Sequence, residues 1–175
     1  MSDPDAATIA GCQRGERSAQ QQLFEHCHCQ VYQLCSRLVN DQDVDDLVQQ
    51  VFIRVYLTIG QFSGRSRFQT WIYRLVVNEC LQHIRCRRRV PEVALVFEPI
   101  GVDVFADIEH EDLLDAALKR LEPQLRTVFV LRELNHMTYG EIAKIVDLSE
   151  GTVASRLSRA RVRMKQLLVD LGWGV

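Results

Sequence analysis

The 175-residue sequence has no apolar run long enough to cross a membrane as a helix. It begins with MSDPDAATIAGCQRGE, which is polar and lacks the basic-then-apolar order of a secretory signal peptide. Both absences predict a cytoplasmic protein without membrane insertion. The six cysteines are therefore expected to be free thiols, because a reducing compartment disfavours disulfides.

The sequence also lacks the residue patterns of an enzyme active site. There is no nucleophile-and-base constellation and no phosphate-binding loop, so neither catalysis nor a cofactor is expected. One short helical stretch carries possible metal ligands, but on a helix these side chains point in different directions, and a closed zinc site needs four. We interpret them as helix-packing residues, with a metal or redox role left open: His26, Cys27, His28, Cys29 and Cys35.

Charge is nearly balanced in total, at −2, but very unevenly distributed. Between residues 64 and 89 every charged residue is an arginine except Glu79, and residues 156–165 are again rich in arginine. Residues 91–115 carry many acids and no lysine or arginine. Basic stretches hold nucleic-acid phosphates even when the whole chain is near neutral, so this pattern favours a nucleic-acid-binding protein.

The stretch from residue 138 to residue 168 has the pattern of a helix-turn-helix. Thr138 and Glu141 form a capping box that starts a short helix. Asp147 suits a left-handed turn, and Ser149 is a good N-cap for a longer second helix. That helix has an apolar stripe and a basic face suited to the DNA major groove. The alternative is an ordinary amphipathic hairpin with a solvated charged face.

Apolar residues at helical spacing predict an all-α chain. The predicted helices cover residues 6–39, 44–59, 69–88, 111–121 and 124–134, in addition to the helix-turn-helix. Pro123 fits a first helical position. Residues 90–110 contain prolines and a glycine and show no period, which predicts a linker between two small helical bundles.

The helix predicted at residues 44–59 carries a polar cluster opposite its apolar stripe. Its members lie within about one turn of each other: Asp45, Asp46, Gln49 and Gln50. Acids are also expected in a first helical turn for reasons of the helix dipole alone. The cluster is therefore either a docking surface or a structural feature of the helix start.

The loop before the next helix combines aromatic and basic residues. Phe62 and Phe68 stand near its ends with two arginines between them, a pattern suited to single-stranded nucleic acid. The helix that follows carries Arg74, Asn78 and Arg85 along one polar side. Asparagine is a good reader of base edges, although an isolated helical asparagine is more often solvated.

Together these segments resemble a bacterial RNA polymerase sigma factor of the extracytoplasmic-function type (ECF, group 4) within the sigma-70 family. The resemblance rests on the order and spacing of four motifs: DVDDLVQQVF at 43–52, FQTWIYR at 68–74 with Asn78, LEP at 121–123, and TYGEIA at 138–143 followed by GTV at 151–153. It implies sigma region 2 over residues 1–89, a linker over 90–110, and sigma region 4 over 111–175.

The resemblance also implies a role for each polar surface. Binding to core polymerase falls to Asp45, Asp46, Gln49, Gln50 and Phe52. Recognition and melting of the −10 element fall to Phe62, Ser63, Arg65, Arg67, Phe68, Trp71, Arg74, Asn78 and Arg85. Recognition of the −35 element falls to Thr152, Ser155, Arg156, Ser158, Arg159 and Arg163. The implied partners are the β′ and β subunits of core polymerase, promoter DNA and an anti-sigma factor.

The sequence departs from the family pattern at three positions. Gln50 stands where the family usually has glutamate, Ala154 where a basic residue is common, and Gln82 where aspartate or asparagine is frequent. These differences are expected to shift promoter choice, and none of them weakens the resemblance to the family. Two rival functions are a stand-alone helix-turn-helix regulator and a DNA-processing enzyme. The acidic helix argues against the first, and the missing catalytic residues against the second.

Overall fold

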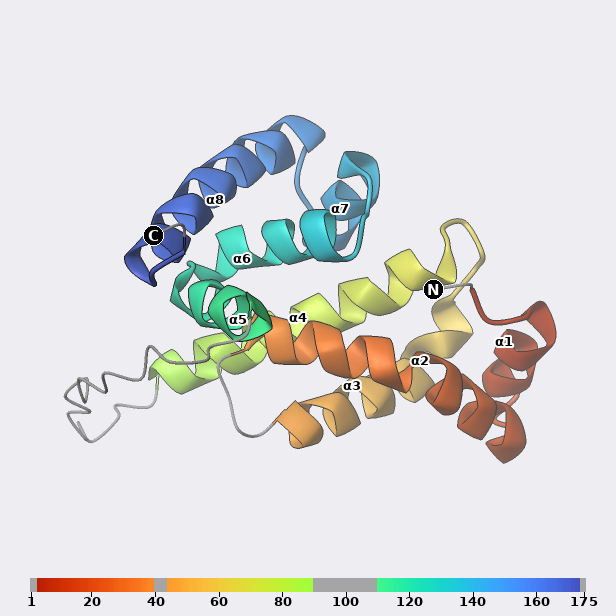
Figure 1. Cartoon of the computed structure of the whole chain (residues 1–175). Coiled ribbons are helices and arrows are strands. Elements are labelled where there is room, and N and C mark those ends of the chain that lie inside the picture. Colours follow the sequence, from red (N-terminus) through yellow and green to blue (C-terminus); the bar gives the residue numbers. More distant parts are fainter. Residues whose placement is uncertain (1–2, 40–43, 90–109, 174–175) are drawn as a thin grey trace.

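The computed structural model describes residues 3–39, 44–89 and 110–173, and every regular element in these ranges is helical (Figure 1). The elements are α1 (Ala6–Gln13), α2 (Arg17–Leu38), α3 (Val44–Thr58), η1 (Ile59–Gln61), α4 (Phe68–Arg89), α5 (His110–Arg120), α6 (Pro123–Phe129), η2 (Val130–Leu134), α7 (Tyr139–Val146) and α8 (Glu150–Asp170). The predicted all-α class is confirmed. The predicted linker lies outside the described residues, except for His110 at the start of α5.

Helices α1 to α4 form the amino-terminal module. The apolar stripe of α2 is buried against α3 and α4, with Leu23, Val31 and Leu34 almost fully covered. The prediction that residues 6–39 are helical is confirmed over α1 and α2, and the chain turns between these two helices at Gly15. This glycine has a φ of +80°, a conformation that side-chain-bearing residues rarely adopt.

Helices α5 to α8 and the π-helical turn η2 form the carboxy-terminal module. The predicted helix start at Pro123 is confirmed, with Glu122 in the N-cap position. The capping box of Thr138 and Glu141 is also confirmed. Asp147 has a φ of +55°, and the Ser149 side chain accepts a hydrogen bond from the Thr152 N–H. Helices α7 and α8 therefore form the predicted helix-turn-helix.

The two modules lie against each other, with α7 beside α4 (Figure 1). The side chain of Arg126 on α6 is only 3% exposed. Its guanidinium donates to the Leu38 carbonyl of the other module at 2.9 Å, and to the Lys119 and Leu121 carbonyls at 2.7 and 2.9 Å. The Asn135 amide donates to the Tyr73 hydroxyl at 3.2 Å. These contacts hold the modules in a closed arrangement.

Candidate polymerase and nucleic-acid interfaces

The polar cluster at the start of α3 lies on the surface. Asp45, Asp46, Gln49 and Gln50 are exposed, whereas the intervening apolar residues of this helix are buried. The acids thus fit both a dipole-stabilised helix start and an accessible docking surface.

Phe52 does not share this surface. It is only 3% exposed, and its ring lies 4.7 Å from that of Phe24 between the ring centroids. Its ring also lies close to those of His28 and Tyr56, so Phe52 is part of the core between α2 and α3 and not of the exposed polar cluster. Sequence reasoning missed two apolar side chains that α3 does expose, Ile53 at 52% and Leu57 at 73%. Ile53 and Leu57 are four residues apart and do not belong to the buried stripe of α3, and this spacing could have identified them as an exposed apolar pair.

The loop between η1 and α4 presents Ser63, Arg65 and Arg67 to solvent. Phe62 and Trp71 are half-buried, and their ring centroids lie 5.5 Å apart. Phe68 is 1% exposed and lies beneath both rings, at 5.3 Å from Phe62 and 5.4 Å from Trp71. Two partly exposed aromatic rings thus lie side by side at this loop, with the buried Phe68 packed against both.

The polar side of α4 is exposed at Arg74, Asn78 and Arg85, as predicted for a nucleic-acid-binding helix. The opposite side is buried at Ile72, Tyr73, Val76, Val77 and Cys80. The structure therefore brings the three polar residues onto the same module as the aromatic loop, with their side chains accessible to solvent.

The basic face of α8 is accessible at Ser155, Ser158, Arg159 and Arg163, while Thr152 and Arg156 are half-buried. A shallow groove of about 370 Å³ runs past Ser158, Arg159 and Arg163. Arg161 lies apart from this group, since its guanidinium binds Glu133 on η2 at 2.7 Å. The helix thus carries accessible arginines at the positions predicted to bind DNA, beside one that pairs with an acid of η2.

A cleft of about 600 Å³ lies between the modules. Its lining includes Arg85 from α4 and Arg156 from α8, together with Leu81, Ile84 and Leu148. One predicted −10 residue and one predicted −35 residue therefore face the same cleft in the closed arrangement.

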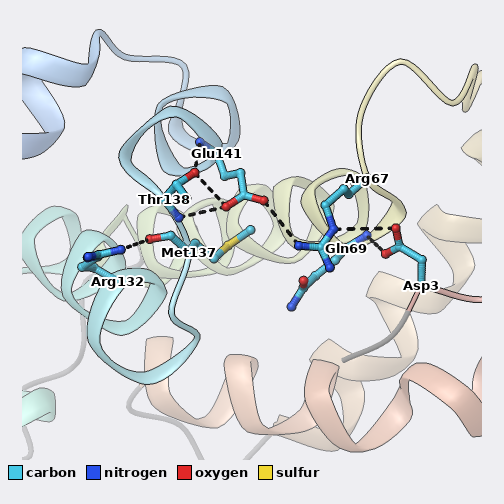
Figure 2. A network of polar contacts seen from close by, with 7 residues as sticks. All are labelled: Asp3, Arg67, Gln69, Arg132, Met137, Thr138 and Glu141. Carbon is cyan, nitrogen blue, oxygen red and sulfur yellow. Dashed lines mark hydrogen bonds and ion pairs between the residues drawn. The ribbon is translucent and has the colours of Figure 1, made fainter.

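An ion pair also joins the loop to the helix-turn-helix. The Arg67 Nη1 lies 3.7 Å from the Glu141 carboxylate (Figure 2). The same carboxylate accepts a hydrogen bond from the Thr138 N–H at 2.8 Å, which lowers the pKa of Glu141 below its usual value. A cap residue of α7 is thus in contact with a predicted DNA-binding residue of the other module.

We expect Thr138→Ala to lower the free energy of unfolding by about 1 kcal/mol, because the first turn of α7 loses its side-chain cap. Urea denaturation at neutral pH measures this change. Because Glu141 has a lowered pKa in the folded state, its stabilising contribution is present above its unfolded-state pKa and is lost as the pH falls through the folded-state value. An unchanged unfolding midpoint in Thr138→Ala would show that this cap does not stabilise the fold.

The possible metal ligands of α2 are dispersed around the helix. Cys27 and Cys35 are buried, whereas Cys29 is exposed and His28 lies among the rings of Phe24 and Tyr32. Burial raises the pKa of Cys27 to about 12. Within residues 3–39, 44–89 and 110–173, no three histidine, cysteine or acidic side chains gather as metal ligands. No helix in these ranges is long and apolar enough to span a membrane.

Comparison with known proteins finds two matching family models. Sigma-70 region 2 matches residues 23–90, and sigma-70 region 4 matches residues 111–164. The ECF RNA polymerase sigma-E factor of Haemophilus influenzae is 34% identical, over 95% of this chain and 96% of its own. The ECF RNA polymerase sigma factor SigM of Mycobacterium tuberculosis is 32% identical, over 98% of this chain and 88% of its own.

Solved structures show the same fold. The sigma factor RpoE of Bartonella quintana, in complex with the anti-sigma factor NepR, aligns with a TM-score of 0.70 and 25% identity. The alignment covers 85% of this chain and 95% of RpoE. CnrH, in complex with the cytosolic domain of CnrY, aligns with a TM-score of 0.68 and 23% identity over 94% of this chain and 96% of CnrH.

Proposed function

The chain belongs to the extracytoplasmic-function group of the sigma-70 family of RNA polymerase sigma factors, and on this basis we propose which of its surfaces bind core polymerase and which bind promoter DNA. As a sigma factor it confers promoter specificity on RNA polymerase. Residues 1–89 form region 2, which docks on core polymerase and recognises the −10 element. Residues 111–175 form region 4, which reads the −35 element. The sigma factor itself carries out no bond chemistry, and its place of action is the cytoplasm, where the polymerase works.

The observation that carries this proposal is the exposed acidic start of α3. Asp45 and Asp46 are on the surface of a module whose other polar face is basic. Exposed carboxylates repel phosphates, so this part of the module does not suit DNA. They suit a protein partner instead, and we assign this surface to the β′ subunit of core polymerase.

For the −10 element we propose that Phe62 and Trp71 receive an unstacked base, with Phe68 as their support. A flipped base needs a pocket with aromatic or apolar neighbours. Arg65, Arg67 and Arg74 then bind phosphates, while Asn78 reads a base edge and Arg85 extends the basic track.

Promoter binding requires the modules to separate. The names of the −10 and −35 elements place them about 25 base pairs apart, which is about 85 Å at 3.4 Å per base pair. Arg85 and Arg156 line the same cleft in the closed arrangement, so they cannot each reach their own element in it. We propose that binding to core polymerase stabilises an open arrangement, at the cost of the Arg126–Leu38, Asn135–Tyr73 and Arg67–Glu141 contacts.

An anti-sigma factor is the proposed regulatory partner. The related RpoE of Bartonella quintana was crystallised with the anti-sigma factor NepR. Occlusion of the α3 surface or of the cleft between the modules by such a protein would keep this chain from polymerase and promoter.

A binding experiment distinguishes a sigma factor from the alternative function, a stand-alone DNA-binding regulator. The purified chain is added to genomic promoter fragments with and without core polymerase. We expect tight, promoter-specific binding only with core, because the individual contacts are modest and gain avidity only at the correct spacing. Equally specific binding without core, together with no affinity for core, would favour the alternative.

The basic face of α8 gives a prediction for −35 recognition. Arg159→Ala is expected to weaken it by about 1–3 kcal/mol if this residue makes a bidentate base contact. The matched control is Arg161→Ala on the same helix, since Arg161 is held by Glu133. Holoenzyme binding to promoters with intact and substituted −35 elements measures both variants. An equal loss in the two variants would mean that only general positive charge matters.

A further inference from the structure

No individual residue of the amino-terminal segment has a role in the function proposed so far. The region 2 family model begins at residue 23, so Asp3, α1 and the turn at Gly15 all precede it. Yet α1 packs against both α2 and η1. A β-carbon on Gly11 would lie 2.6 Å from that of Ala19, so α1 approaches α2 as closely as a glycine allows. The segment is therefore fixed in place beside the −10 loop.

Gln13, the last residue of α1, binds the start of that loop. Its side-chain Nε2 donates to the Ile59 carbonyl at 3.2 Å and to the Phe62 carbonyl at 2.9 Å. The Phe62 N–H also donates to the Ile59 carbonyl, at 3.0 Å. One amide group thus bridges the two ends of the single turn η1. Because Ile59 is buried, this bridge ties the backbone of Phe62 to the core.

Asp3 binds the other end of the loop. Its carboxylate accepts a hydrogen bond from the Gln69 N–H at 3.1 Å, and it lies 3.8 Å from the Arg67 Nε (Figure 2). The acid thereby caps the first turn of α4 and orients an exposed arginine. The amino-terminal segment holds the loop on both sides of its exposed residues, Ser63 and Arg65.

We propose that this segment positions the −10 reading loop, with Gln13 as the principal positioning residue. The proposal rests on the assignment of the loop to −10 recognition. Gln13 sets the backbone of Phe62, and hence the place of its ring beside Trp71, while Asp3 sets the far end of the loop. A loop fixed in this way receives an unstacked base without first having to become ordered.

The test replaces Gln13 by methionine, which keeps the length and helical preference of the side chain but removes both donors. The matched control is Gln21→Met on α2, where the side chain donates to the exposed Glu25 on the same helix. Wild-type holoenzyme first selects active promoters from a library randomised at both elements. Rates of open-complex formation are then measured on the best promoter and on single-base variants of each element.

The readout is the discrimination ratio between the selected and altered −10 elements. We expect Gln13→Met to reduce this ratio about tenfold, as the loss of two hydrogen bonds implies. Discrimination at −35 and affinity for core remain unchanged, and Gln21→Met matches the wild type in every measurement. If Gln13→Met instead lowers the rate equally at all promoters, or leaves the −10 ratio unchanged, the positioning role is overturned. Failure of wild-type holoenzyme to select any promoter would instead contradict the function on which this proposal rests.

Discussion

Replacing Asp45 and Asp46 together by alanine is expected to weaken binding to core polymerase about 100-fold. Both carboxylates are exposed at the start of α3. Each is proposed to make a charge-assisted hydrogen bond to the polymerase, and the loss of two such bonds accounts for roughly 3 kcal/mol. The measurement is a titration of labelled sigma factor with sigma-free core polymerase.

The control removes two other exposed acids, through Glu25→Ala and Asp170→Ala. This variant has the same net charge, so it reports any general electrostatic effect. Thermal unfolding of both variants is measured as well, because acids in a first helical turn stabilise the helix through its dipole. If the Asp45 and Asp46 variant binds core polymerase with unchanged affinity, these acids only stabilise the start of α3 through the helix dipole. Equal losses in the two variants would also contradict a specific docking surface.

Locking the two modules together is expected to abolish promoter-specific transcription. Arg67→Cys and Glu141→Cys replace two side chains whose charged groups lie 3.7 Å apart. The exposed Cys29 and Cys86 are changed to serine, and the other cysteines are buried. A flexible bismaleimide with a reducible bond then joins the introduced thiols. Because the cross-linked modules cannot span about 85 Å of promoter, run-off transcript falls to background.

Reduction of the bismaleimide cross-link provides the control, because the same preparation is then assayed with and without the cross-link. Activity is expected to return to that of the uncross-linked double variant, which separates the effect of closure from the loss of Arg67. Binding of the cross-linked protein to core polymerase is measured in parallel. Full promoter-specific transcription by the cross-linked protein would show that the modules need not separate.

Much of the helical architecture was predictable because its signals are local. The capping box at Thr138, the left-handed turn at Asp147 and the N-cap at Ser149 each depend on neighbours within a few residues, and all three are confirmed. The start of α6 at Pro123 is confirmed for the same reason. The turn at Gly15 was not predicted, because helix-forming residues surround this glycine and a single glycine is a weak signal for a turn.

The contacts between distant segments were not predictable. Nothing in the sequence indicates that Arg126 reaches the Leu38 carbonyl, or that Gln13 reaches the carbonyls of Ile59 and Phe62. Such bonds depend on how the helices pack, and any arginine or glutamine of suitable position satisfies them. The burial of Phe52 and Phe68 was missed for a related reason. Each aromatic ring fits both a binding face and a core, and only packing decides between them.

The predicted binding surfaces are therefore better described as exposed residues with buried supports. Ser63, Arg65 and Arg67 lie on the surface, while Phe68 fixes the rings behind them. On α3, likewise, Asp45 and Asp46 are exposed, whereas Phe52 is buried against Phe24 further along the helix. The structure thus separates the residues proposed to make contacts from those that hold them in position.

Reconstituted transcription tests the central claim most directly. The purified chain is added to sigma-free core polymerase from the same organism, with genomic promoter fragments as templates. We expect discrete run-off transcripts that require this chain, arise at a subset of fragments and disappear when either promoter element is scrambled. No chain-dependent transcript from any fragment, together with no binding to core polymerase, would contradict this claim.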